Sequence, residues 1–253
     1  MENITETKHI IRKSSCHYCY LKSRCLAEGL TSDELQPFCD AILHTKCFRR
    51  GQHLFYLGDR FKNLYIIKSG SVKLYLCTEN DGAEQVNDFI FPGGVAGLEA
   101  IGNGRYLSSA VALESTTVCI LPYSRFNELC SRLPHLQERF MHLVSSKIAS
   151  VNRLLLLINQ RTAKERLASF LLDYCFSKNL SSQPKWEVKL TMSRYDIANY
   201  LGLTAETISR QFTKMDKERI LKVEKHRVRI LDHEGLIAIA RTSNTYPNAA
   251  TIH

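Results

Sequence analysis

One long apolar repeat separates this sequence into two parts of different character. Between residues 135 and 158 there is no glycine or proline, and apolar residues recur at alternating spacings of three and four. They are Met141, Val144, Ile148, Val151, Leu155 and Ile158. This spacing predicts a helix with an apolar stripe, typical of a helix that pairs with another helix. A helix packed only on its own domain needs one stripe, but Leu143, Leu154 and Leu157 add a second apolar surface. We therefore expect a parallel dimer helix.

The part before this helix predicts β-strands. Residues 52–57, 63–67 and 72–78 are rich in aromatic and branched apolar side chains, and a longer run of the same kind follows at 106–121. Short sequences rich in Gly, Asp and Asn separate these stretches and are typical of turns. Strands at this regular spacing predict an antiparallel roll or sandwich.

The part after the helix contains a helix-turn-helix pattern. Ser193 can cap a first helix, with Asp196 three residues later as a near capping box. Gly202 stands where that helix needs a left-handed final residue, and Thr204 can cap a second helix over residues 204–217. Helical hairpins that bind no DNA share this turn. However, the alternating, cation-rich residues 222–231 predict a two-stranded wing, which favours a winged helix-turn-helix.

Charge and hydropathy narrow the function classes. The net charge is +9, from 34 Lys and Arg against 25 Asp and Glu, and +6 of it lies after residue 160. This surplus suits a polyanionic partner, although it also suits a solvated surface. The longest apolar run, residues 154–158, is too short for a membrane span, and the first residues lack the apolar core of a signal peptide. No nucleophile, acid–base pair or phosphate loop stands in a recognisable frame. We expect a cytoplasmic protein that is not an enzyme and has no membrane partner.

The cysteines are unevenly placed along the chain. Nine occur, and three of them form Cys16-x2-Cys19-x5-Cys25 near the start. An odd and uneven set in a reducing compartment argues against a disulfide framework. Three interpretations remain open: a metal or cluster site, thiol redox chemistry, or small apolar residues in a core.

Together these features resemble the CRP/FNR family of bacterial transcription regulators over almost the whole chain. Residues 164–171 are similar to the helix that opens the family's DNA-binding domain, and residues 191–210 closely match its helix-turn-helix signature. The resemblance implies an α+β fold: an N-terminal antiparallel β-roll of the cyclic-nucleotide-binding, jelly-roll type, a long dimerisation helix and a C-terminal winged helix-turn-helix. The implied domains are a cysteine-rich cluster-binding segment (1–30), a β-roll sensor domain (31–133), the dimerisation helix (134–160), the DNA-binding domain (161–236) and a C-terminal tail (237–253).

Members of the family that bind cyclic nucleotides hold the phosphate with a Gly-Glu-Leu and a downstream Arg-Ser/Thr-Ala. The corresponding segments here are Gly97-Leu98-Glu99 and Ser108-Ser109-Ala110, in which the arginine is absent and the carboxylate has moved by one position. Burying a phosphate without a cation is costly. We therefore expect no cyclic-nucleotide binding.

The cysteine motif resembles that of the FNR-type oxygen sensors, which hold a [4Fe–4S] cluster. This resemblance implies three ligands at Cys16, Cys19 and Cys25, and a fourth at Cys119, whose flanking sequence is also similar. Four thiolates are a suitable set for such a cluster, while zinc or a bare thiol switch remains the alternative. The other cysteines are interpreted as structural. Arg24 departs from the family pattern, in which an apolar residue shields the cluster, so the oxygen sensitivity of a cluster here is open.

The same resemblance implies an oxygen-responsive transcription regulator. The cluster would favour a DNA-binding homodimer without oxygen, and oxygen would convert or destroy the cluster. The dimer would bind an inverted repeat of TTGAT type in double-stranded DNA and contact RNA polymerase. The residues placed at the bases are Thr204, Glu206, Thr207, Ser209 and Arg210. Arg210 can donate to guanine and Glu206 can accept from cytosine. The competing hypothesis is a regulator of the same family that senses a haem gas or another small effector.

One position in the apolar stripe also departs from the best-known FNR-type proteins. Those proteins carry an acidic residue near its middle, at the position of Val151 here. Facing carboxylates would oppose a dimer, whereas facing valines favour it. The sequence therefore predicts that the protein without its cluster dimerises more readily than those relatives.

Overall fold

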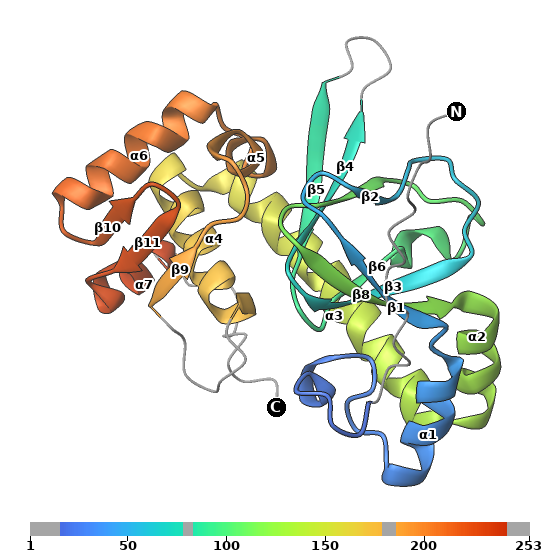
Figure 1. Cartoon of the computed structure of the whole chain (residues 1–253). Coiled ribbons are helices and arrows are strands. Elements are labelled where there is room, and N and C mark those ends of the chain that lie inside the picture. Colours follow the sequence, from blue (N-terminus) through green and yellow to red (C-terminus); the bar gives the residue numbers. More distant parts are fainter. Residues whose placement is uncertain (1–15, 78–82, 179–185, 242–253) are drawn as a thin grey trace, which may run out of the picture. The chain divides into compact units, whose positions relative to one another are not determined.

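The computed structural model describes residues 16–77, 83–178 and 186–241 (Figure 1). The chain forms two compact units, residues 1–151 and 152–253, and the division falls within one long helix. The first unit is built on antiparallel sheets and the second is mainly helical. The fold class predicted from the sequence is confirmed.

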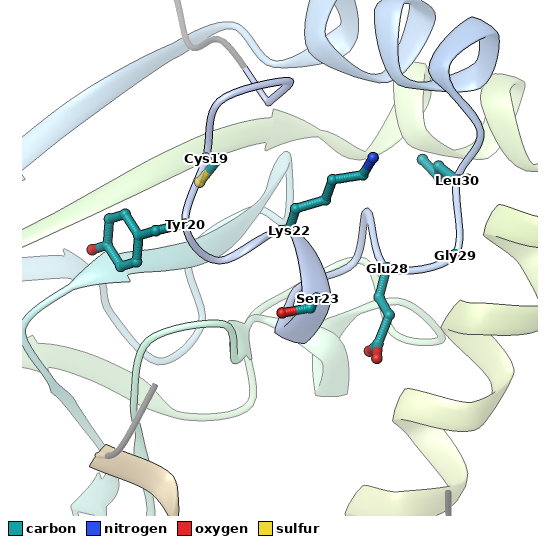
Figure 2. Close-up of a pocket in the computed structure, with 7 residues that line it drawn as sticks. All are labelled: Cys19, Tyr20, Lys22, Ser23, Glu28, Gly29 and Leu30. Atoms are coloured by element: carbon teal, nitrogen blue, oxygen red, sulfur yellow. The ribbon is translucent and has the colours of Figure 1, made fainter. Parts of the chain in front are cut away.

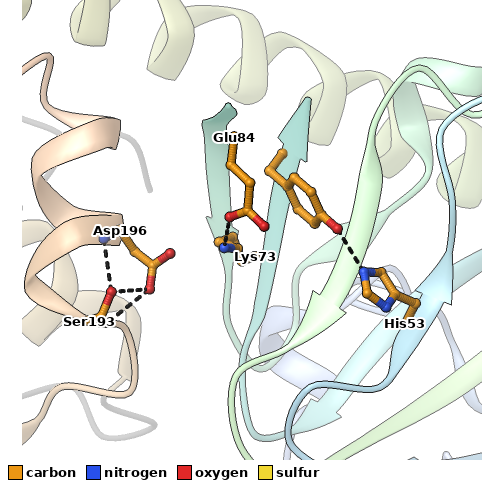
Figure 3. A network of polar contacts seen from close by, with 6 residues as sticks. His53, Lys73, Glu84, Ser193 and Asp196 are labelled. Atoms are coloured by element: carbon orange, nitrogen blue, oxygen red, sulfur yellow. Dashed lines mark hydrogen bonds and ion pairs between the residues drawn. The ribbon is translucent and has the colours of Figure 1, made fainter. Parts of the chain in front are cut away.

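The first unit contains two four-stranded antiparallel sheets. One has the order β1-β8-β3-β6 and the other the order β2-β7-β4-β5. Their strands are β1 (His44–Phe48), β2 (His53–Phe55), β3 (Asn63–Ser69), β4 (Val72–Cys77), β5 (Glu84–Ile90), β6 (Val95–Ala96), β7 (Ser109–Ala112) and β8 (Thr116–Pro122). The buried Lys73 of β4 forms an ion pair with Glu84 of β5, with 2.5 Å between Nζ and Oε2 (Figure 3). In the same sheet, His53 Nε2 of β2 lies 2.8 Å from the Tyr75 hydroxyl of β4.

The run at 106–121 forms two strands, where the sequence suggested one continuous stretch. β7 pairs with β2 and β4, whereas β8 pairs with β1 and β3, so the chain changes sheets between them. The turn at 113–115 contains no glycine or proline, which explains why the sequence did not mark it.

Two short helices accompany the first sheet, and neither was predicted. They are α1 (Ser32–Ala41) and α2 (Tyr123–Arg132). A capping box starts α1: the Thr31 side chain accepts from the Glu34 amide, and the Glu34 carboxylate accepts from the Thr31 amide. The buried side chains of both helices join the same core cluster, on the far side of the sheet from β2-β7-β4-β5.

The long helix α3 covers Pro134–Gln160 and confirms the predicted helix. Leu136 is its only buried residue. Met141, Ile148, Val151 and Leu155 are each about half exposed or more, while Val144 and Ile158 are partly buried. In the single chain, most of the apolar stripe therefore faces solvent.

The second unit is a winged helix-turn-helix. It contains α4 (Ala163–Lys178), β9 (Glu187–Lys189), α5 (Arg194–Tyr200), α6 (Ala205–Lys217), β10 (Leu221–Glu224), β11 (Arg227–Ile230) and α7 (His233–Arg241). Ser193 and Asp196 form the capping box that starts α5 (Figure 3), and Gly202 has a φ of 63° at the turn before α6. The wing has three strands in the order β10-β11-β9, because β9, which was not predicted, pairs with β11.

Candidate functional site

The segment before α1 brings three cysteines to one buried cluster of side chains. Cys16 and Cys25 are buried there, beside Leu26 and Leu30. Cys19 is partly buried and packs against the same cluster. A short 3-10 turn, Lys22–Arg24, lies between Cys19 and Cys25, and the Lys22 amide donates to the Cys19 carbonyl. The residues between the cysteines of the motif therefore form a compact loop, which we call the cysteine loop.

Strand alternation brings the fourth predicted cysteine to this cluster. In β8, Val118 and Ile120 point into the core between the two sheets, whereas Cys119 and Leu121 point to the other face. In β3, which pairs with β8, Ile66 lies opposite Cys119 and belongs to the same cluster. A shift of one residue in the pairing of β8 would have turned Cys119 into the core between the two sheets, away from the other cysteines.

The thiols lie close enough to affect one another's ionisation. Burial raises the pKa of the Cys16 thiol, and the neighbouring Cys39, Cys119 and Cys25 raise it further. Burial also raises the pKa of Cys25 to about 11, with smaller contributions from Cys19 and Cys119. The raised pKa values of Cys16 and Cys25 favour their protonated thiols, and a bound metal would have to displace those protons.

The donor set fits an iron–sulfur cluster by its chemistry. Cys16, Cys19, Cys25 and Cys119 form no disulfide, and all four lie in or pack against one apolar cluster. Within the described residues, no three His, Cys, Asp or Glu side chains are arranged as a ready metal site. Binding would therefore draw these thiols closer together.

A fifth thiol, Cys39 of α1, also lies in this cluster. Its Sγ accepts a hydrogen bond from the Cys16 amide at 3.1 Å. The sequence interpretation placed Cys39 among structural cysteines, because nothing in its spacing connects it with the motif. Only the position of α1, which was not predicted, reveals the contact.

A pocket of about 410 Å³ opens beside Cys19 (Figure 2). Its lining residues are Cys19, Tyr20, Lys22, Ser23, Glu28, Gly29 and Leu30. The Tyr20 hydroxyl donates to the Lys68 carbonyl at 2.6 Å and fixes the loop to the end of β3. Cys19 is thus the predicted ligand that solvent approaches most directly.

The segments that resemble a cyclic-phosphate site lie together. Ser108 Oγ donates to Glu99 Oε1 at 2.7 Å. The carboxylate is thus bonded within the fold, and neither Gly97-Leu98-Glu99 nor Ser108-Ser109-Ala110 supplies a cation. An anionic phosphate has no charge partner in these two segments.

The residues predicted to read DNA share the exposed face of α6. Ile208, Phe212 and Met215 form its buried face. On the other face, Arg210 lies 3.8 Å from Glu206 and donates to Thr207 Oγ1 at 3.3 Å. Thr204 caps the helix by accepting from the Thr207 amide, and Ser209 Oγ donates to the Ala205 carbonyl. The structure therefore brings Thr204, Glu206, Thr207, Ser209 and Arg210 to one accessible surface.

The wing contributes cations that are already partly neutralised. Arg227 and Arg229 of β11 both pair with Glu187 of β9, at 3.6 Å and 3.0 Å. Lys225 stands at the turn between β10 and β11 with a φ of 54°. Because β9 was not predicted, neither was the carboxylate that faces the two arginines.

By length and composition alone, α3 is apolar enough to cross a membrane. Its sequence, however, carries the regular apolar stripe of a helix that pairs with another helix, and three cations, Arg139, Lys147 and Arg153, lie on its other faces.

The last residue of the stripe, Ile158, lies against the turn of the helix-turn-helix. A Cβ on Gly202 in that turn would be 3.3 Å from Ile158 Cγ2.

Comparisons with known proteins agree with this architecture. Residues 45–133 match the protein family described as "Cyclic nucleotide-binding domain", and residues 165–239 match the family described as "Crp-like helix-turn-helix domain". The chain is 38% identical over 228 residues to the fumarate and nitrate reduction regulatory protein of Vibrio cholerae, covering 90% of this chain and 91% of that one. It is 34% identical to the transcriptional activator protein FnrA of Stutzerimonas stutzeri, covering 90% and 93%.

Solved structures show the same fold. FixK2 from Bradyrhizobium japonicum is 25% identical, with a TM-score of 0.69, covering 77% of this chain and 96% of that one. A CRP/FNR-family regulator from Thermus thermophilus is 22% identical, with a TM-score of 0.61, covering 79% and 100%. With curated relatives above 30% identity over most of both chains, this chain belongs to the CRP/FNR family of transcription regulators.

Proposed function

We propose that this protein is an oxygen-responsive, DNA-binding transcription regulator of the FNR type whose sensor is a [4Fe–4S] cluster. The observation that carries the proposal is the meeting of Cys16, Cys19, Cys25 and Cys119 at one core cluster in the first unit. The relatives named for fumarate and nitrate reduction support the same assignment. As a member of a family of transcription regulators, the protein is not an enzyme.

The four cysteines would hold the iron–sulfur cluster where the cysteine loop packs against β8 and α1. When bound, a [4Fe–4S] cluster supplies an oxygen-reactive centre whose loss frees its four thiolates. The apolar side chains around Cys25 and Cys119 keep water away from the ligand sulfurs, while the pocket beside Cys19 leaves one side accessible. The chain therefore provides both a protected site and a route of approach.

The remaining elements would connect that site with DNA. The exposed stripe of α3 would pair with the same stripe of a second copy, which covers the side chains that the single chain leaves in solvent. Two copies of α6 would then reach the two halves of an inverted repeat of TTGAT type, with Arg210 and Glu206 at base edges. Such a homodimer would act in the cytoplasm and contact RNA polymerase.

Anaerobic purification tests the sensor directly. We expect a brown protein that contains iron and acid-labile sulfide in the ratio of a [4Fe–4S] cluster, with a broad visible absorption band. A sharp Soret band would indicate haem, and colourless protein with bound zinc would indicate a structural site. Either result would reject the cluster.

DNA binding tests the response. We expect the anaerobic protein to bind an inverted TTGAT repeat, and exposure to oxygen to weaken that binding together with the visible band. Cyclic AMP should have no effect, since the two segments that would hold its phosphate lack a cation. Binding that follows cyclic AMP and ignores oxygen would contradict the proposal.

A further inference from the structure

The first turns of α3 contact the cysteine loop through an arginine. Arg139 forms an ion pair with Glu28, and its Nε donates to the carbonyl oxygen of Cys25 at 3.4 Å. The side chains of Arg139 and Glu28 are 29% and 40% exposed, so the pair is partly shielded from solvent. A single guanidinium therefore contacts both a predicted cluster ligand and a carboxylate three residues beyond it.

Apolar packing surrounds this contact. Leu136 is fully buried in the cluster that holds Cys25 and Leu26, and Phe140 and Leu143 pack against that cluster. A second polar contact, between His135 Nδ1 and Glu34 of α1 at 3.0 Å, lies one turn earlier on the helix. The polar and apolar contacts occupy the same end of α3, and both reach the segment that carries the thiols.

We propose that Arg139 is a positioning residue that, together with Glu28, couples occupation of the thiol site to pairing of α3. The proposal rests on the function proposed above. A contact can transmit a binding event only if its free energy differs between the empty and the occupied states. Arg139 meets this requirement because it contacts the backbone of Cys25, whose position must adjust when four thiolates gather on one group.

The coupling is measured as a ratio. For each protein, sedimentation gives the dimer association constant with and without the cluster, and the ratio of the two constants is the coupling. We expect Arg139→Gln and Glu28→Gln each to lower this ratio by about fivefold or more, with unchanged iron and sulfide content. The double variant should lower it no further than either single change, because both remove the same contact.

Two controls separate coupling from general damage. Arg132 pairs with Glu128 of the same helix, α2, and both side chains are largely exposed, so Arg132→Gln should keep the wild-type ratio. The exchanged pair Arg139→Glu with Glu28→Arg should not restore the coupling, because a carboxylate at position 139 cannot donate to the Cys25 carbonyl. An unchanged ratio in Arg139→Gln, a loss of iron in that variant, or full recovery in the exchanged pair would each overturn the proposal.

A measurement without the cluster distinguishes this proposal from the proposed function. In cluster-free protein, Arg139→Gln should speed amide hydrogen exchange in residues 16–30, and Arg132→Gln should not. If wild-type protein takes up no iron, the cluster assignment fails whatever the exchange shows. If it takes up iron but exchange in 16–30 is the same in Arg139→Gln and wild type, the positioning role of Arg139 fails.

Discussion

At the scale of single residues, six cysteines lie in or pack against one apolar cluster, and their contacts separate them. Cys16, Cys25 and Cys119 are buried, and Cys19 is reached from the neighbouring pocket. Cys39 differs because it is held on a helix and accepts a backbone hydrogen bond from Cys16. Four thiolates complete a [4Fe–4S] cluster, so two of the six are in excess. The motif and the strand position of Cys119 favour Cys39 and Cys130, which both lie on helices, as the excess thiols.

Serine variants test that assignment. Changing Cys119 to Ser should greatly reduce iron and sulfide content and abolish anaerobic DNA binding, because a hydroxyl replaces a thiolate ligand. Cys39→Ser should retain the cluster, as should Cys130→Ser and Cys175→Ser, since the sequence interpretation treats these three as structural. Loss of iron in Cys39→Ser with full iron in Cys119→Ser would exchange the two residues in the ligand set.

Base reading can be tested with a matched pair of variants. Arg210→Ala should cost roughly 1–3 kcal/mol on the specific site and relax the preference for guanine at one position of each half-site. Lys225→Ala, at the turn of the wing, should weaken binding to all sequences alike and flatten its salt dependence. Binding to specific and random DNA at several salt concentrations measures both effects. An unchanged specificity ratio in Arg210→Ala would place a different residue at the base.

At the scale of elements, the sequence predicted what local signals determine. The helix-turn-helix followed from a cap, a left-handed glycine and a second cap, and α3 followed from its repeat. Missing from the prediction were the helices α1, α2 and α7 and the strands β1, β5, β6 and β9. The start of α1 carries a local signal, the capping box of Thr31 and Glu34, that the prediction did not include, whereas β9 forms by pairing with the distant strand β11. Consequently the four ligand candidates were found by motif, whereas Cys39, Arg139 and Glu187 became visible only in the fold.

The turn between α5 and α6 offers a stability test. Gly202 has a φ of 63°, and a Cβ there would lie 3.3 Å from Ile158 Cγ2. Gly202→Ala should destabilise the winged helix-turn-helix by about 1–2 kcal/mol. Trp186, the single tryptophan, belongs to this unit, so its fluorescence during urea unfolding reports on it alone.

Gly102 provides the control for that measurement. It lies in the first unit, and a Cβ on it would meet nothing within 4 Å. Gly102→Ala should therefore leave the Trp186 transition unchanged. Equal shifts in both alanine variants would show that the unfolding of the two units is coupled and that the shift does not measure the turn.

At the scale of the whole molecule, α3 is the one element common to both units. It begins beside the thiols, where Leu136 and Arg139 contact the cysteine loop, and ends where Ile158 contacts the helix-turn-helix. Between these ends its apolar stripe is largely exposed. Pairing of that stripe would therefore be sensitive to the state of the cysteine loop, and its intrinsic strength sets how much control the cluster can exert.

Val151 should make that intrinsic strength high. It is 46% exposed, so roughly 1 kcal/mol of hydrophobic free energy per copy is available when the stripe is covered. Two copies contribute about 2 kcal/mol, or about thirtyfold in the association constant. We expect much of the cluster-free protein to be dimeric at micromolar concentration, so that oxygen acts partly through the orientation of the DNA-binding units.

Sedimentation of the cluster-free protein tests this expectation. Val151→Asp should lower the dimer association constant by at least about thirtyfold, because the valine contacts are lost and two carboxylates approach each other as the stripe is covered. Ser150→Asp adds the same charge one residue away, at an exposed position outside the stripe, and should have a much smaller effect. A monomeric wild type, or equal effects of the two aspartates, would show that Val151 does not lie at the dimer contact. A dimeric wild type that becomes monomeric only with Val151→Asp would show that this one side chain accounts for the difference in dimerisation from FNR-type proteins that carry an acidic residue at this position.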